Sequence, residues 1–208
     1  MKLNNFALGF DFDGVIVNSL AVMEKSWKEV CKKNNLNIPF HSYKENIGLK
    51  FNEILKNIGV KKSFHKRINI DYFELTKKYQ SEIKLYPLVQ ETLIKLKGNN
   101  ISTFIVTSKP RENTLHLLKM FDIKVELLIC ADDVTYGKPH NESGKLVRQK
   151  FKNKKIFYVG DMNSDFKFAE NCNFNFIYAS YGYGTLDKNP IFKIDSISEI
   201  IELKALFI

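Results

Sequence analysis

The sequence is poor in cysteine and in long apolar runs, and both shortages limit what the protein can be. Its 208 residues include three cysteines, Cys31, Cys130 and Cys172, which are far apart and form no CxxC pair. Such a pattern predicts reduced, structural thiols and argues against a disulfide scaffold or a zinc site. No apolar run approaches the ~20 residues that cross a bilayer, and the N-terminus lacks the features of a signal peptide. We therefore expect a cytoplasmic protein that has no membrane partner.

Arginine is also scarce, although the chain is basic. Lysine and arginine number 32 against 23 acidic residues, which gives a net charge of +9, but the arginines are Arg67, Arg111 and Arg148 alone. Proteins that read nucleic-acid bases rely on the forked guanidinium, whereas lysine supplies a point charge. Because the lysines are spread along the whole chain, biased amino-acid usage explains the charge better than a nucleic-acid surface does. A basic surface still attracts anionic substrates such as phosphates.

The chain does contain enough apolar material for a core, since hydrophobic residues make up 44% of it. Between residues 17 and 84 these residues recur at steps of three and four, as in Leu20, Met23, Trp27 and Val30. This spacing predicts an all-helical segment. Phe51, Ile54, Leu55 and Ile58 repeat the pattern, and so do Ile68, Tyr72, Leu75 and Tyr79.

Outside that segment, short apolar runs alternate with helical patterns. We predict strands at 6–10, 101–106, 125–130, 156–159, 174–179 and 191–194, and helices at 88–97, 111–121, 141–151, 164–172 and 197–206. Alternating strands and helices predict a parallel sheet that is covered on both faces. The expected fold class is therefore α/β, with a Rossmann-like core formed by residues 1–16 and 85–208. The helical segment 17–84 is interpreted as a subdomain inserted after the first strand.

Polar residues stand where the predicted strands end, at the sheet edge where open α/β sheets bind ligands. They form four groups: Asp11-Phe12-Asp13-Gly14, Thr107-Ser108, Gly137-Lys138-Pro139, and Asp161 with Asp165. Carboxylates from separate loops can hold Mg²⁺, and a lysine, a hydroxyl and backbone N–H groups can surround a phosphoryl group. Singly, each group has a simpler explanation as a surface turn, a loop or a helix start. Their joint occurrence, in order and at strand ends, favours a phosphoryl-transfer site.

These four groups resemble the four motifs of the haloacid dehalogenase-like superfamily, and the resemblance covers essentially the whole chain. The helical segment is similar to the alpha-helical cap of its phosphoglycolate phosphatase-like branch. The resemblance implies that Asp11 is the nucleophile, that Asp13 is the general acid and then the base, and that Thr107 with Ser108 binds phosphate. Lys138 would neutralise charge between the nucleophile and the phosphoryl group.

The same resemblance implies a magnesium enzyme. Asp161 would bind Mg²⁺ together with Asp11 and the backbone carbonyl of Asp13, and Asp165 would orient Lys138 or a metal-bound water. An aspartate at position 13 is typical of the family's phosphatases and phosphomutases, because both must protonate an alkoxide. Asn18 departs from the aspartate that is common in this branch, at the hinge into the cap.

The sequence therefore predicts a Mg²⁺-dependent phosphatase that acts on a small soluble phosphomonoester: phosphoglycolate, a sugar phosphate or a nucleotide monophosphate. The alternatives are a phosphomutase that resembles beta-phosphoglucomutase, a non-catalytic binding protein on the same scaffold, and a nucleic-acid-binding module. Lys50 has two equal interpretations, as a substrate contact from the cap or as a solvated lysine at a helix start. The sequence leaves the oligomeric state open.

Overall fold

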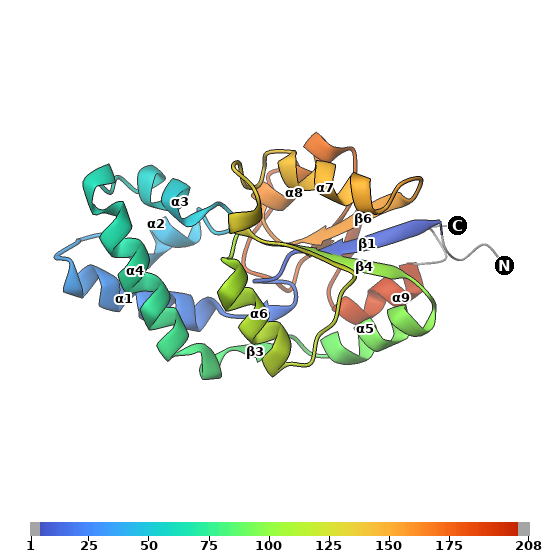
Figure 1. Ribbon diagram of the computed structural model, residues 1–208, viewed down its shortest axis with the longest axis horizontal. Helices are drawn as coiled ribbons and strands as arrows, with labels where there is room; N and C mark the ends of the chain where they lie inside the picture. The colour runs from blue at the N-terminus through green and yellow to red at the C-terminus, as the bar shows by residue number, and fades with distance from the viewer. Residues whose placement is uncertain (1–4, 204–208) are drawn as a thin grey trace.

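The computed structural model describes residues 5–203, and its centre is a six-stranded parallel sheet (Figure 1). Its strands, in spatial order, are β5 (Leu127–Ile129), β4 (Ser102–Val106), β1 (Phe6–Phe10), β6 (Lys155–Gly160), β7 (Asn175–Ala179) and β8 (Phe192–Ile194). Each neighbouring pair runs parallel, with β1 in the middle between β4 and β6. The predicted α/β fold class is confirmed.

Helices cover both faces of this sheet, which explains why its central strands are apolar at nearly every position. On one face lie α5 (Val89–Gly98), α6 (Arg111–Met120) and α9 (Ile200–Leu203), and on the other lie α7 (Glu142–Lys150) and α8 (Asn163–Cys172) (Figure 1). Every residue of β1 and of β4 is buried. A strand that is buried on both sides needs a continuous apolar run rather than an alternating one.

Between the first two strands of the sheet, the chain forms a separate block of helices, here called the helical insertion (Figure 1). It consists of α1 (Leu20–Lys33), α2 (Phe40–Lys44), α3 (Phe51–Asn57) and α4 (Lys62–Lys78). Two short antiparallel strands, β2 (Val17–Asn18) and β3 (Lys84–Leu85), pair where the chain enters and leaves it. The pairing places the two connections side by side, so the insertion is joined to the sheet at one narrow point.

The predicted helical stripes form the interior of the insertion. Met23, Trp27 and Val30 of α1 are buried against Ile54 of α3 and Tyr72 of α4. Among the described residues, no helix combines the length and the apolar character that a membrane span requires.

The C-terminus differs in part from the prediction. The predicted helix 197–206 begins as a 3₁₀ turn at Ile197–Glu199 and continues as α9, whereas residues 204–206 lie outside the described residues.

Candidate active site

The loops that follow the strands bring five of the predicted site residues to one place. Asp11 directly follows β1, Thr107 follows β4, Asp161 follows β6, Asp165 lies in the first turn of α8, and Lys138 lies in the loop before α7. All five side chains are buried. Parallel strands end at a common edge of the sheet, so residues up to 154 positions apart in the sequence, Asp11 and Asp165, become neighbours.

Lys138 is the centre of this cluster. Its Nζ lies 2.8 Å from Asp11 Oδ1 and 2.6 Å from Asp165 Oδ1, and it also donates a hydrogen bond to the hydroxyl of Tyr158. Burial lowers the pKa of Lys138, but the charges of Asp11 and Asp165 outweigh that effect and raise it. The ammonium is therefore held as a cation between two carboxylates. Tyr158, which donates onward to the carbonyl of Val106, has no sequence signal that sets it apart from other strand residues.

Three carboxylates form a buried acidic group beside this lysine. Asp11, Asp161 and Asp165 each offer an oxygen, and these oxygens lie within 4.8 Å of one another. Asp161 Oδ2 accepts a hydrogen bond from the backbone N–H of Tyr183 at 2.7 Å, but Asp161 Oδ1 is buried without a hydrogen-bond partner. An unpartnered buried carboxylate oxygen is costly. The donor set therefore fits a small hard cation, which prefers oxygen ligands.

The charges of this group are only partly balanced by protein residues. Burial raises the pKa of Asp11 to about 7, although Lys138 opposes the rise. Burial, together with the nearby Asp165 and Asp11, also raises the pKa of Asp161 well above its ordinary value. A cation next to these carboxylates would lower both pKa values, because opposite charge favours the ionised form.

Asp13 turns away from the acidic group. Its Oδ1 accepts a hydrogen bond from Ser19 Oγ at 2.5 Å, and its Oδ2 lies 3.0 Å from the ammonium of Lys109. The Ser19 amide in turn donates to the hydroxyl of Tyr183 at 2.6 Å. Ser19 and Lys109 were not predicted as site residues. The position of Lys109, directly after the predicted Ser108, was the one available signal.

Two glycines allow the backbone to approach Asp161 closely. Gly14 has a φ of +89°, and a Cβ at this position would lie 2.3 Å from Asp161 Oδ2. A Cβ at Gly182 would lie 2.3 Å from the Cβ of Asp161. A larger residue at either position would displace the carboxylate, which explains the glycines that follow Asp13 and Tyr181 in the sequence.

A comparison with protein families decides the identity of this arrangement. The model of the haloacid dehalogenase-like hydrolases matches residues 9–179. The chain belongs to the haloacid dehalogenase-like hydrolase family. The prediction that the protein is a hydrolytic enzyme is thereby confirmed.

Individual members of this hydrolase family are similar over most of the chain. The pyrophosphatase PpaX of Oceanobacillus iheyensis is 26% identical over 206 residues, which cover 93% of this chain and 94% of that protein. The phosphoglycolate phosphatase of Rhodobacter capsulatus is 24% identical over 140 residues, or 65% of this chain and 63% of that protein. The crystal structure of a hydrolase from Pseudomonas syringae superimposes with a TM-score of 0.87 at 19% identity, covering 97% of this chain and 99% of that one.

Two predicted residues of this hydrolase connect the sheet to the helical insertion. Ser108 Oγ donates a hydrogen bond to the carbonyl of Gly48 at 2.5 Å. Lys50 Nζ donates to the carbonyls of Val134 and Thr135, at 2.9 and 3.2 Å. The ammonium of Lys50 therefore binds the core backbone, and Lys50 does not line the cleft that contains Asp11.

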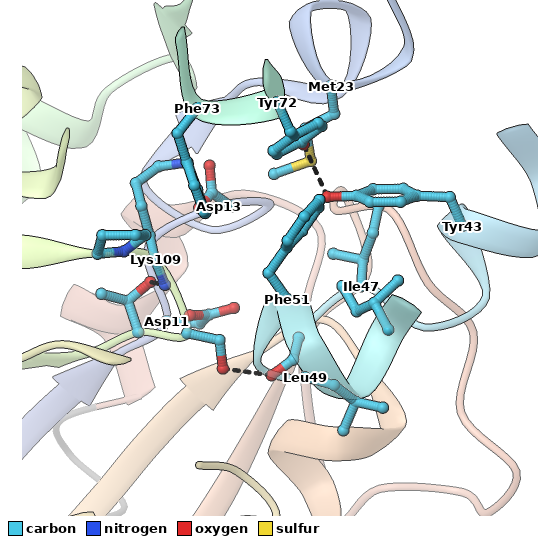
Figure 2. Close-up of a pocket in the computed structure, with 15 residues that line it drawn as sticks. Asp11, Asp13, Met23, Tyr43, Ile47, Leu49, Phe51, Tyr72, Phe73 and Lys109 are labelled. Carbon is cyan, nitrogen blue, oxygen red and sulfur yellow. Dashed lines mark hydrogen bonds and ion pairs between the residues drawn. The ribbon is translucent and has the colours of Figure 1, made fainter. Parts of the chain in front are cut away.

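That cleft lies between the sheet edge and the helical insertion of the hydrolase (Figure 2). About 50 Å³ of it is open to the centre of a water molecule. Asp11, Asp13, Thr107 and Lys109 line it from the sheet side. Side chains of the insertion form the opposite wall, so a bound ligand would contact both parts of the molecule.

Proposed function

We propose that the protein is a Mg²⁺-dependent phosphatase that hydrolyses a small phosphomonoester through an aspartyl-phosphate on Asp11. One observation carries the proposal: buried Lys138 bridges Asp11 and Asp165, while Asp161 presents an unpartnered oxygen beside them. This cluster combines a nucleophile, a fixed cation and oxygen ligands for a metal in one buried place. It supports phosphoryl transfer because that reaction depends on positioning and on neutralising charge.

The side chains have complementary roles in the proposed reaction. Lys138 holds one oxygen of Asp11 and leaves the other free to attack phosphorus. As the P–O bond to the leaving group breaks, Asp13, which enters this step in its protonated form, gives its proton to the leaving oxygen, and an aspartyl-phosphate forms on Asp11. Asp13 then accepts a proton from the water that attacks this intermediate, which releases phosphate and restores Asp11. Ser19 and Lys109 fix the orientation of Asp13 during both steps.

Asp11, Asp161 and the backbone carbonyl of Asp13 are the proposed holders of Mg²⁺. When bound, the ion supplies positive charge that offsets the charge of the transferring phosphoryl group. Asp165 positions Lys138, because its Oδ1 contacts the ammonium and its Oδ2 accepts a hydrogen bond from the amide of Met162 at 3.1 Å. Thr107 lines the cleft beside Asp11, where its hydroxyl can bind a phosphoryl oxygen.

The helical insertion favours a phosphatase over the phosphomutase alternative. A mutase that turns a hexose phosphate within its cleft needs hydrogen-bonding partners for several sugar hydroxyls. Among the described residues that line the cleft from the insertion, the polar side-chain groups are the hydroxyls of Tyr43 and Tyr72, which bond each other at 2.7 Å. A non-catalytic binding protein, the other alternative, would have no need for the buried charges around Lys138.

Phosphate release from a panel of phosphomonoesters tests the proposed function. The panel contains phosphoglycolate, sugar phosphates, nucleotide monophosphates and acetyl phosphate, each assayed with Mg²⁺ and again with EDTA. We expect turnover that requires the metal, that is abolished by Asp11→Asn, and that is retained by Asp122→Asn, a matched change at an exposed site. Absence of release from folded protein with Mg²⁺, or full activity in Asp11→Asn, would refute the proposal. Conversion of a hexose 1-phosphate to the 6-phosphate would identify a mutase.

A further inference from the structure

The helical insertion gives the cleft an apolar wall that faces the carboxylates. Figure 2 shows Phe51, Tyr72, Tyr43 and Met23 gathered across the cleft from Asp11, and Phe73 also lines the cleft. None of the described insertion residues that line the cleft carries a charge; they are Met23, Tyr43, Ile47, Gly48, Leu49, Phe51, Ile54, Tyr72 and Phe73.

The aromatic rings of this wall form one packed group. The ring of Phe51 is stacked on that of Tyr72, with centroids 4.4 Å apart and planes inclined by 22°, and the ring of Phe73 lies 5.3 Å from that of Phe51. Phe51 and Tyr72 are buried, whereas Phe73 is partly exposed at the cleft. A flat apolar group of a ligand could therefore extend the stack by contact with Phe73 and Phe51.

The polar ends of the two tyrosines add no charge to the wall. Tyr43 and Tyr72 bond each other through their hydroxyls at 2.7 Å, so one of the two protons is used within the pair. Burial raises the pKa of both hydroxyls, which keeps them neutral. The pair leaves at most one proton to donate to a ligand, so the wall suits a leaving group with few polar atoms.

Of the two nearby cations, one lies on the catalytic side of the cleft and the other lies outside its lining. The ammonium of Lys109 lies 3.0 Å from Asp13 Oδ2, at the catalytic side of the cleft. That of Lys50 donates to the carbonyls of Val134 and Thr135, outside the cleft lining. A negatively charged leaving group held against the insertion would lose its water without gaining a partner, which is costly for a carboxylate or a phosphate.

We propose, building on the phosphatase function proposed above, that the cleft selects phosphomonoesters with an uncharged, apolar and preferably aromatic leaving group. The phosphoryl group would lie at Asp11, and the leaving group would pack against the rings of Phe73 and Phe51 from the cleft side. Phosphoglycolate, with a carboxylate close to its ester oxygen, and inorganic pyrophosphate, with a second phosphate there, are poor ligands for this wall.

A matched set of three substrates tests this selectivity. Benzyl phosphate, ethyl phosphate and phosphoglycolate all release a primary alcohol, so their ester bonds are of similar reactivity while the remainder differs in shape and charge. We expect kcat/KM for benzyl phosphate to exceed that for ethyl phosphate by about tenfold or more. We expect phosphoglycolate to fall below ethyl phosphate by about tenfold or more, because of its charge. A value for phosphoglycolate equal to or above that for benzyl phosphate would overturn the inference.

Acetyl phosphate, a small activated substrate, separates the two ways of failing. If acetyl phosphate is hydrolysed with Mg²⁺ but phosphoglycolate is the best ester, the phosphatase function stands and the inferred selectivity is wrong. If neither acetyl phosphate nor any ester is hydrolysed by the folded protein, the phosphatase function fails and the inference fails with it.

Variants of the wall provide a second test. Phe73→Ala should lower the ratio of kcat/KM for benzyl phosphate to that for ethyl phosphate by about tenfold. Phe64→Ala makes the same change on the same helix, α4, but Phe64 is 46% exposed and does not line the cleft. This control should leave the ratio unchanged. Phe73→Leu replaces Phe73→Ala if the latter does not fold. A ratio in the folded Phe73 variant equal to that of the wild type would contradict the proposed contact.

Discussion

Replacing Lys138 by methionine would remove the cation from a buried cluster of carboxylates. Methionine keeps much of the volume of the lysine stem, so the change mainly removes charge. The ammonium is 2.8 Å from Asp11 and 2.6 Å from Asp165, and the Lys138 residue is only 2% exposed. Taking one partner from a buried ion pair costs about 3–5 kcal/mol, because the remaining charge has no compensation. We therefore expect Lys138→Met to lower the free energy of unfolding by about 4 kcal/mol.

This loss is a large part of the free energy of unfolding of an ordinary domain, yet it should leave the variant folded, so that the loss can be measured. Native proteins have a free energy of unfolding of about 5–15 kcal/mol, so the variant should still fold. A loss of about 4 kcal/mol corresponds to a fall in Tm of about 8–16 °C. Urea unfolding and thermal melts in EDTA measure the effect without a bound metal that could replace the missing charge.

A second substitution tests the electrostatic reason for the loss. Asp165→Asn alone should destabilise the protein, because it weakens the contact with Lys138. In the Lys138→Met background the same change should restore about 1–2 kcal/mol, since it removes one of the uncompensated charges. Lys145→Met, at an exposed position of α7, is the matched control and should change stability by less than about 0.5 kcal/mol. If Asp165→Asn destabilises both backgrounds equally, the charge argument is wrong.

Four further substitutions probe other parts of the molecule. Gly14→Ala would place a Cβ 2.3 Å from Asp161 Oδ2, and should lower metal-dependent phosphate release at least tenfold. Gly59→Ala has a similar φ of +81° but open space around it, so it should cost only about 1–2 kcal/mol of backbone strain in urea unfolding and leave activity unchanged. Lys50→Met removes a link between insertion and core, and should lower kcat/KM for every substrate of the panel by a similar factor; an effect on one substrate alone would instead indicate a direct contact. Burial raises the pKa of Asp71, but its two hydrogen-bond partners at the end of α1 outweigh this and lower it. Its stabilising contribution should therefore be present above about pH 4 and lost as the pH falls through the lower folded pKa, and Asp71→Asn should remove this part of the acid dependence in urea unfolding at pH 7 and pH 3.

The sheet and the residues at its edge could be predicted from the sequence because each depends on a local pattern. A continuous apolar run marks β1 as a strand that is buried on both sides, and β4 has an apolar run after Ser102 and Thr103. Asp11, Thr107 and Asp161 each directly follow such a run. Once the strands are known to be parallel, their ends must meet. The sequence therefore predicted which residues would gather, and the family resemblance implied that Lys138 would lie beside Asp11 and be oriented by Asp165, as the two ion pairs show.

Contacts that depend on the direction of a side chain could not be predicted from the pattern of apolar and polar residues. Tyr158 lies within the apolar run of β6, and only the three-dimensional structure shows that its hydroxyl reaches Lys138. Ser108 and Lys50 were considered as ligand contacts, and in the structure their polar atoms bond backbone carbonyls between the core and the helical insertion, while Ser108 also lines the cleft. A polar residue close to a binding motif can bind a ligand or a neighbouring backbone group, and its residue type does not distinguish the two.

The aromatic wall shows the same ambiguity on the apolar side. Phe51 and Tyr72 fall on helical stripes, which predict core packing, and both are indeed buried in the interior of the insertion. The same rings also line the cleft opposite Asp11. Catalysis uses polar residues that stand out at the ends of strands, whereas the proposed selectivity uses apolar residues whose spacing is set by folding. Because the same stripes meet both requirements, the sequence does not distinguish a ligand-binding ring from a core ring. The proposed reaction could be inferred from motifs, whereas the proposed leaving group could be inferred only from the way the helices close over the sheet.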